Sequence, residues 1–343
     1  MGKKISFLLL VIFSMTIGCA KSPTSPSSGN WELVTNHAFS NGRYGLTGTV
    51  FNGQMWAVGG ASGPVTTYYS DVYSSGDGAN WTQTTGSAPF GGRYGSQLLS
   101  FGGKLWLIGG NNSGYFKNDV WNSIDGINWT LVLAPTTLGT GTQFSPREDF
   151  GALVYNGLMW VIGGFDGQSR NDVWCSPDGI TWTKVLGSTA SGGANQFAGR
   201  FGFGTAIFNN EMWVFDGANA LSSNSDPVFG YADSWYSTNG NTWTLATSNG
   251  NYGRLYFTQA VSFNNLLWIP AGYLWNNWGG QSGVATSSNG IQWNDVVGSF
   301  PPRFYHLSLA YNGYIWVIAG ADDYCASTQA CPVIYLNDVW RTH

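Results

Sequence analysis

The feature that most constrains this chain is an internal repeat of about 50 residues, a length typical of propeller blades. The second unit contains GRYGSQLLSFGGKLWLIGG and KNDVWNSIDGINWT, and the third contains PREDFGALVYNGLMWVIGG and RNDVWCSPDGITWT. A unit of this size cannot bury its apolar side chains alone, so neighbouring units have to pack together. We therefore expect the repeats to form one body, although 343 residues would by length alone suggest about two or three domains.

The repeat occurs six times, and every unit carries the same two markers. Each unit opens with an arginine: Arg43, Arg93, Arg147, Arg200, Arg254 and Arg303. Each later carries a strand tryptophan: Trp56, Trp106, Trp160, Trp213, Trp268 and Trp316.

Turn residues divide each unit into four short strands. Asn-Gly, Gly-Gly or Asn-Asn follows the first apolar run, and this is a strong hairpin signal. A second tight turn precedes the fourth strand, at Asp77-Gly78, Asp125-Gly126, Asp178-Gly179, Asn239-Gly240 and Asn289-Gly290. A four-stranded meander leaves its faces exposed, so radial packing of blades is expected.

The two ends of the repeat region predict a closed ring. Residues 30–34 have the pattern of a fourth strand, whereas residues 337–340 have that of a third strand. The fourth strands begin at Trp31, Trp81, Trp129, Trp182, Trp243 and Trp293. The first of them should complete the last blade. We thus predict an all-β, six-bladed β-propeller of four-stranded antiparallel blades over residues 30–343.

An arginine-opened strand, a hairpin, an aromatic residue before Gly-Gly and a Trp in the closing strand together resemble the kelch repeat. The resemblance covers residues 30–343 and implies a propeller like the central domain of galactose oxidase. Three units depart from Gly-Gly, with Phe215-Asp216-Gly217, Ile269-Pro270-Ala271-Gly272 and Ala319-Gly320. The recurring S-x-[DN]-G-x-x-W is similar to the Asp-box of sialidase-like propellers but one residue shorter, and we interpret it as a turn signature.

The charge composition limits the classes of partner that this chain is expected to bind. Charged residues make up 9% of the chain, the formal net charge is -4, and no Lys/Arg run occurs outside the N-terminus. A surface without a basic field is poorly suited to a phosphate backbone, so no nucleic-acid partner is expected.

The N-terminal segment predicts export. Lys3 and Lys4 precede an apolar stretch, and Thr16-Ile17-Gly18-Cys19 resembles a bacterial lipobox. We interpret residues 1–18 as a lipoprotein-type signal peptide, Cys19 as the lipidation site and residues 19–29 as a Ser/Pro-rich tether. The expected product is a monomer in the bacterial cell envelope that touches the membrane only through its lipid anchor. The alternative is an ordinary secretory signal with Cys19 left over.

The other cysteines fit an oxidising compartment. Cys325 and Cys331 lie close together in one loop and are predicted to form a local disulfide. Cys175 lies in a strand pattern and is interpreted as a small buried hydrophobe.

Long connections should gather on one face of the propeller and form its recognition surface for a glycan or protein ligand. The loop of the fifth unit, GYLWNNWGGQSG, contains Tyr273, Trp275 and Trp278, and no strand is expected to continue through them. Flat aromatic rings beside amides suit sugars or a protein hot spot. Alternatively, these rings cover neighbouring loops.

The six arginines offer a second candidate site. At the starts of the innermost strands they would approach one mouth of the channel and collect an anionic ligand. The alternative is structural pairing with aspartates at the starts of the third strands: Asp71, Asp119, Asp172, Asp233 and Asp338. The fifth unit has Gly283 at this position, so Arg254 is expected to lack a partner.

A binding module is favoured over an enzyme, with a purely structural envelope role as a third option. His37, His306 and His343 are too few for a copper centre, and neither a metal nor another cofactor is expected. Glu148, Asp149 and Glu211 are the acid/base candidates for the alternative, a carbohydrate-active enzyme similar to sialic-acid mutarotases or glycosidases and acting at the channel mouth.

Overall fold

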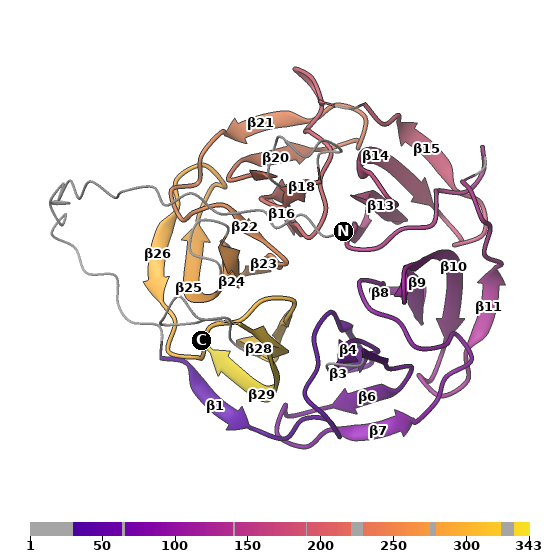
Figure 1. Ribbon diagram of the computed structural model, residues 1–343. Helices are drawn as coiled ribbons and strands as arrows, with labels where there is room; N and C mark the ends of the chain where they lie inside the picture. The colour runs from indigo at the N-terminus through magenta and orange to yellow at the C-terminus, as the bar shows by residue number, and fades with distance from the viewer. Residues whose placement is uncertain are drawn as a thin grey trace, which may run out of the picture.

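The computed structural model describes residues 30–63, 66–139, 141–189, 191–220, 229–274, 279–323 and 333–343. Six antiparallel sheets surround a central axis, with the first strand of each innermost and the fourth outermost (Figure 1). The six-bladed propeller predicted from the repeat is confirmed. Over the described residues, no helix is long and apolar enough to cross a membrane.

The first three blades are regular four-stranded meanders. Blade 1 comprises β2 (Thr47–Phe51), β3 (Gln54–Val58), β6 (Val72–Ser75) and β7 (Thr82–Thr85), with the short pair β4 (Ala61–Ser62) and β5 (Thr67–Tyr68). Blade 2 comprises β8 (Gln97–Phe101), β9 (Lys104–Asn112), β10 (Tyr115–Ser123) and β11 (Thr130–Leu133). Blade 3 comprises β12 (Gly151–Tyr155), β13 (Leu158–Phe165), β14 (Ser169–Ser176) and β15 (Thr183–Leu186).

The last three blades vary more. Blade 4 comprises β16 (Gly204–Phe208), β17 (Glu211–Phe215), β20 (Ser234–Ser237) and β21 (Thr244–Thr247), with the pair β18 (Ala218–Asn219) and β19 (Phe229–Gly230). Blade 5 comprises β22 (Leu255–Tyr256), β23 (Val261–Phe263), β24 (Leu266–Leu274), β25 (Gly279–Ser287) and β26 (Asn294–Val297). Blade 6 comprises β27 (Leu307–Tyr311), β28 (Tyr314–Asp322), β29 (Ile334–Thr342) and β1 (Glu32–Thr35).

The ring closes as the ends of the repeat region predict. Strand β1 pairs antiparallel with β29, with Leu33 opposite Trp340, and forms the outer edge of blade 6 (Figure 1). Within this strand pair, Arg341 lies opposite Glu32 and forms an ion pair with it at 3.0 Å. Both ends of the repeat region therefore belong to one sheet.

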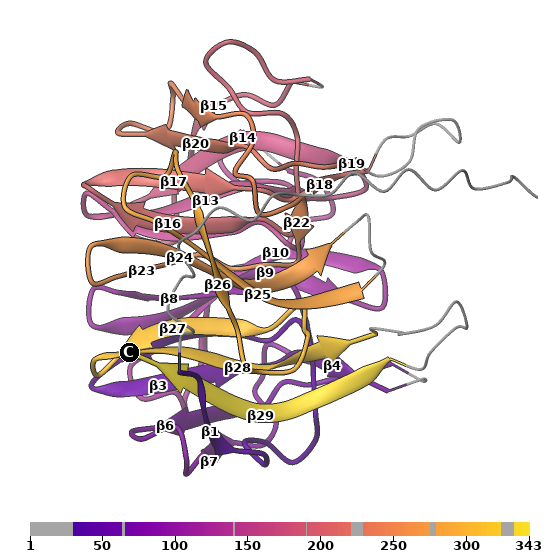
Figure 2. The ribbon, with the colours of Figure 1, turned by 90° about the vertical axis from the view of Figure 1, so that its left-hand side faces the viewer.

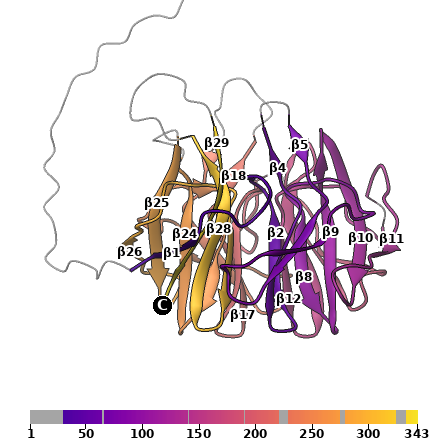
Figure 3. The same cartoon turned by 90° about the horizontal axis from the view of Figure 1, so that it is seen from below.

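The two faces of the ring differ in their connections (Figures 2 and 3). Tight hairpins join the first and second strands and the third and fourth strands on the short-turn face. Longer segments, including β4, β5, β18 and β19, lie on the opposite side, the long-connection face. Variation in length is thus confined to one face, as the sequence predicts.

A turn glycine locks each of five blades to its predecessor. Gly126, in the last turn of blade 2, has a φ of 71°, and a Cβ atom there would lie 2.0 Å from the Trp56 ring. The same close approach recurs in the pairs Gly78–Trp316, Gly179–Trp106, Gly240–Trp160 and Gly290–Trp213. Only glycine combines this backbone conformation with this contact, so the hairpin signal in the sequence also marks the blade interfaces.

The turns themselves are held by side-chain oxygens. In blade 2, the Ser123 hydroxyl accepts a hydrogen bond from the Gly126 N–H at 2.8 Å. The Asp125 carboxylate accepts from the N–H groups of Asn128 and Ile127, which lowers its pKa below the ordinary value. Because S-x-[DN]-G-x-x-W places these oxygens at fixed offsets, its interpretation as a turn signature is confirmed.

Candidate functional site

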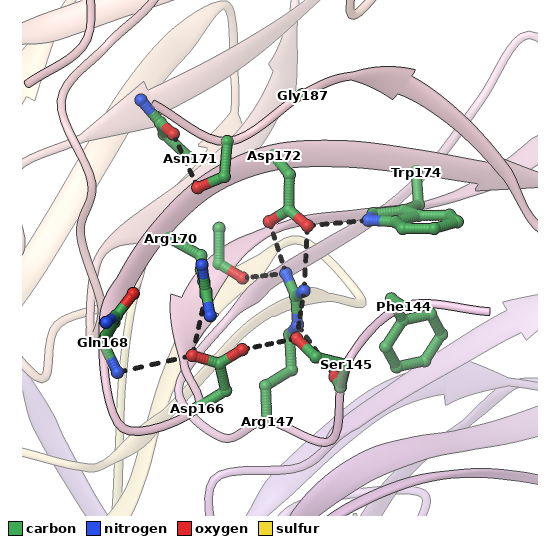
Figure 4. Close-up of polar contacts among 12 residues, drawn as sticks. Phe144, Ser145, Arg147, Asp166, Gln168, Arg170, Asn171, Asp172, Trp174 and Gly187 are labelled. Atoms are coloured by element: carbon green, nitrogen blue, oxygen red, sulfur yellow. Dashed lines mark hydrogen bonds and ion pairs between the residues drawn. The ribbon is translucent and has the colours of Figure 1, made fainter. Parts of the chain in front are cut away.

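Five of the six repeat arginines are buried inside their own blades. In blade 3, the Arg147 guanidinium contacts both oxygens of Asp172, at 2.7 and 2.9 Å, and the Gly163 carbonyl at 2.8 Å (Figure 4). Trp174 donates its indole N–H to the same carboxylate at 2.8 Å. Arg147, Asp172 and Trp174 form a closed polar cluster, called here the blade triad.

The arginine–aspartate pairing recurs in the other four blades of this type. The ion pairs are Arg43–Asp71, Arg93–Asp119, Arg200–Asp233 and Arg303–Asp338. Trp121, Trp235 and Trp340 complete three of these clusters, and blade 1 has Tyr73 at this position. Burial alone would raise the pKa of Asp172, but Arg147 and Trp174 hold the pKa below its ordinary value. The expected structural pairs are therefore present.

These five arginines do not approach the channel mouth, contrary to the first expectation. Each of these arginine residues is at most 1% exposed, and its guanidinium donates to a carboxylate and to backbone carbonyls. A buried guanidinium whose donors are engaged in this way is not available to a ligand. The anionic-ligand hypothesis for these residues loses its physical basis.

Arg254 does not occupy the equivalent position in blade 5. The carbonyl of Leu255 accepts a hydrogen bond from the Gly217 N–H, as that of Arg93 does from the Gly60 N–H. Leu255 is thus the structural counterpart of the arginines, and Arg254 lies one residue earlier, exposed and without a partner among the described side chains. One additional residue after Arg254 shifts the alignment of this unit with the other five. The shift is hard to see in the sequence, because this unit also opens with an arginine.

The innermost connections form a ring of backbone hydrogen bonds around the axis. Its members, called here the axial ring, are Gly45, Gly95, Asp149, Gly202, Phe257 and Tyr305, all with φ between 52° and 63°. The N–H of Gly95 donates to the Gly45 carbonyl, and that of Asp149 donates to the Gly95 carbonyl. Three members are not glycine, and a left-handed backbone at a bulky residue is an uncommon, strained arrangement that concentrates at functional sites.

The three side chains of the axial ring meet at the axis. The Tyr305 hydroxyl from blade 6 donates to the Asp149 carboxyl from blade 3 at 2.5 Å, which joins opposite blades. Phe257 stacks on Tyr305 with 3.7 Å between ring centroids. Burial and the adjacent Glu148 raise the pKa of Asp149 well above its ordinary value. Asp149, Phe257 and Tyr305 therefore form a crossbar over the channel.

Glu148 lies beside this crossbar. It is 8% exposed, and burial raises its pKa, while the neighbouring Tyr94 and Asn111 side chains oppose that rise. Burial and Coulombic repulsion also raise the pKa of Tyr44 to about 12. The structure thus brings Glu148 and Asp149 to the axis, together with tyrosines that the sequence did not single out. Glu211 begins β17 at the short-turn face and does not join them.

Aromatic rings from all six blades connect around the crossbar. Contacts between neighbouring rings, such as Tyr44–Tyr305 at 5.5 Å, link them into one group on the long-connection face. The members of this aromatic network are Tyr44, Tyr68, Tyr94, Phe116, Phe165, Phe201, Tyr256, Phe257, Tyr273, Phe304, Tyr305 and Tyr335. All of these residues are half-buried, so part of each side chain borders solvent.

Below the axial ring, the channel encloses a cavity of about 210 Å³ lined mainly by glycine, threonine, serine and glutamine residues. The Ser96 hydroxyl and both imidazole nitrogens of His306 are buried without a hydrogen-bond partner. Burial and the nearby Arg303 lower the pKa of His306 to about 3, which keeps the imidazole neutral. Polar atoms of this kind are suited to ordered water in the channel.

The remaining predicted residues have varied positions. Tyr273 lies within β24, where it pairs with Tyr256 and Gly280, so the expectation that no strand continues through it is wrong. The second strand of blade 5 extends because β22 and β25 both pair with it. Cys175 is half-buried in β14 against the core, and burial raises its pKa. Trp275, Trp278, Cys19, Cys325 and Cys331 lie outside the described residues.

No three His, Cys, Asp or Glu side chains of the described ranges lie close enough together to hold a metal ion. Comparison with protein families finds the Kelch motif at residues 146–175. This segment contains the complete blade triad and both axial carboxylates. No curated protein is detectably similar to the chain.

Proposed function

Because the chain is a kelch-repeat β-propeller, a fold consistent with a binding module, we propose that it binds a carbohydrate. The ligand would contact the aromatic network and the axial carboxylates on the long-connection face. The observation that carries this proposal is the single connected group of aromatic rings around Glu148 and Asp149.

The chemistry of this surface favours a neutral sugar. Tyrosine rings offer flat apolar area for the C–H faces of a pyranose, and their hydroxyl groups add hydrogen bonds at little cost in side-chain entropy. Carboxyl oxygens from Glu148 and Asp149 would accept hydrogen bonds from sugar hydroxyls. Five of the six repeat arginines are paired inside their blades, so no cluster of cations among the described residues supports an anionic ligand here.

Binding to a glycan array, followed by calorimetry with the best ligand, tests the proposal. Tyr44→Ala should weaken binding at least about 10-fold, since one stacked ring and its polar contacts commonly contribute more than 1.4 kcal/mol. Ile180→Ala is the matched control, because Ile180 is 53% exposed on the opposite, short-turn face. Equal affinities of the two variants for the ligand would refute the proposed site. Capture of a protein instead of a glycan would refute the carbohydrate as the ligand.

Tethering to a bacterial membrane is part of this proposal. The segment around Cys19 supplies the lipidation pattern, and residues 19–29 would hold the propeller away from the bilayer. Expression in a bacterial host with labelled fatty acid should label the wild-type chain but not Cys19→Ala. Equal labelling would refute the anchor without affecting the binding site.

Catalysis on a carbohydrate is the second candidate, and the raised pKa values of Glu148 and Asp149 favour it. A carboxyl group that keeps its proton toward neutral pH can act as a general acid. Free sugars should then be isomerised or hydrolysed, with activity lost in Asp149→Asn. Tight sugar binding without turnover would leave the binding module as the function.

A further inference from the structure

Blade 5 lacks every member of the blade triad. Leu255 takes the place of the arginine, Gly283 that of the aspartate and Ala285 that of the tryptophan. In the other blades the third residue is Trp or Tyr. Three large or polar side chains are therefore missing together, at positions that touch one another in blade 3.

The strand register supports this equivalence. Ala285 lies opposite Asp295 on the fourth strand, as Trp174 lies opposite Lys184 in blade 3. A Cβ atom on Gly283 would have no atom within 4 Å, so the space of the missing aspartate is open. The missing side chains are not replaced by neighbouring ones that move into the same space.

A cavity of about 300 Å³ remains where the triad would be. Leu255, Gly283 and Ala285 all line it, together with Tyr252, Leu274 and Asp295. Its lining is mainly apolar, and Asp295 is the only charged side chain among the lining residues. An apolar cavity of this size favours an organic ligand over water.

The edge of blade 5 is also rebuilt. The other five blades have an irregularity between the third and fourth strands, whereas β25 and β26 pair without one. Val297 consequently lies opposite Gly283 at the rim of the cavity and is 67% exposed. An exposed valine beside an open apolar cavity indicates a surface that is suited to a ligand.

We propose that this cavity binds a small molecule with a planar aromatic ring and an ammonium group. The ring would occupy the space that an indole fills in blades 2, 3, 4 and 6, and the ammonium group would pair with Asp295. Since no cation lines the cavity, charge complementarity favours an amine over a carboxylate ligand. This inference does not depend on the glycan proposal, because the two sites consist of different residues.

Titration of the full chain with tryptamine, followed by calorimetry, tests the proposal. Wild type should bind tryptamine about 10-fold more tightly than indole-3-acetate, whose charge is reversed. Ala285→Trp should refill the cavity and weaken tryptamine binding at least about 10-fold, without lowering the melting temperature. Binding of sugars should not change in this variant.

Asp295→Asn is the second variant. Because Asp295 is exposed, this substitution should leave the fold intact. It should bind tryptamine about 5-fold more weakly and indole as well as wild type does. Undiminished tryptamine binding in both variants, or no binding of tryptamine to wild type, would overturn the proposal. Loss of sugar binding alone would count only against the proposed function.

Discussion

Blades 3 and 5 are antiparallel sheets in the same ring, with four and five strands, but different interactions hold their incoming connections in place. In blade 3, a buried ion pair ties Arg147, just before the first strand, to Asp172 on the third strand. In blade 5, Leu255 packs among apolar side chains, and the Tyr252 hydroxyl donates to the Asp216 carboxyl of blade 4 at 3.0 Å. In blade 5, a neutral hydrogen bond and apolar packing thus hold the incoming connection, which an ion pair holds in blade 3.

The comparison also shows how much space the triad occupies. Blade 3 fills the region with a guanidinium, a carboxylate and an indole, and blade 5 leaves a cavity there. Because ring closure needs only that each blade buries its faces, one blade can lose the triad while the other five keep the ring together. Repetition therefore frees a single blade for a ligand.

The largest expected difference between the two blades concerns their arginines. Arg147→Ala should lower the free energy of unfolding by about 4 kcal/mol, because it leaves the Asp172 carboxylate buried without its counter-ion. Arg254→Ala should change it by less than about 0.5 kcal/mol, since Arg254 is exposed and unpaired. Urea denaturation of both variants measures this difference, and similar losses would contradict the assignment of Leu255 as the structural counterpart.

The next largest effect comes from making blade 3 resemble blade 5. Trp174→Ala should cost about 3 kcal/mol, because Trp174 is 2% exposed and its removal leaves a cavity. The new cavity faces Lys184, whose ammonium group lies 4.8 Å from the Trp174 ring centroid in the wild type. Calorimetry of Trp174→Ala should therefore show a preference for indole-3-acetate over tryptamine, opposite to that of blade 5. The same preference in both blades would show that the adjacent charge does not set selectivity.

A smaller effect is the opposite pH dependence of the two buried carboxyl groups. The pKa of Asp172 is lowered, so its contribution to stability is present above the unfolded-state pKa and is lost as pH falls toward the folded-state pKa. Burial raises the pKa of Asp216 well above 3.8, so the native state keeps a proton that the unfolded state releases. Stability from this group therefore falls as pH rises from about 4 toward the folded-state pKa.

Asp216→Asn isolates the second of these effects. Asparagine has no proton to release, so the variant lacks this contribution to the pH dependence. Between pH 5 and pH 8, the free energy of unfolding of the wild type should therefore fall by about 1 kcal/mol more than that of the variant. Thermal unfolding of wild type and variant across this range measures the difference. Parallel pH profiles would show that Asp216 ionises normally in the folded protein.

The smallest effect is expected when the ion pair is transferred to blade 5. Leu255→Arg combined with Gly283→Asp should change the unfolding free energy by less than about 1 kcal/mol, because the desolvation of a buried pair offsets most of its attraction. Each single substitution should be more destabilising than the pair, and a double-mutant cycle measures the coupling. Additive effects would mean that the two side chains do not meet.

Most of the fold was predictable because turn glycines, strand tryptophans and triad residues recur at fixed offsets. The pairing of β1 with β29 follows from the excess fourth strand at Trp31. The structural arginine pairs were predictable as well, since five of the six arginines have an Asp at the start of the third strand. In these features local chemistry and global topology agree in most copies of the repeat.

The axial site was harder to predict because it lies where the repeat is broken. Asp149, Phe257 and Tyr305 occupy ring positions at which three other blades have glycine. The available signal was the departure of these three blades from the Arg-aromatic-Gly pattern. This signal does not indicate that Tyr305 contacts Asp149, which lies 156 positions earlier in the chain. The identity of Leu255 was likewise hidden, because one additional residue moved Arg254 out of the structural position.

The clasp formed by β1 has a mechanical consequence. Its four residues are the first described part of the propeller's sheet, and their partner β29 is the last strand of the chain. A pull on the polypeptide before Asn30 would act on this short edge strand before any other element. The ring would therefore yield first at its seam, and the strength of β1 pairing sets the force that the propeller withstands.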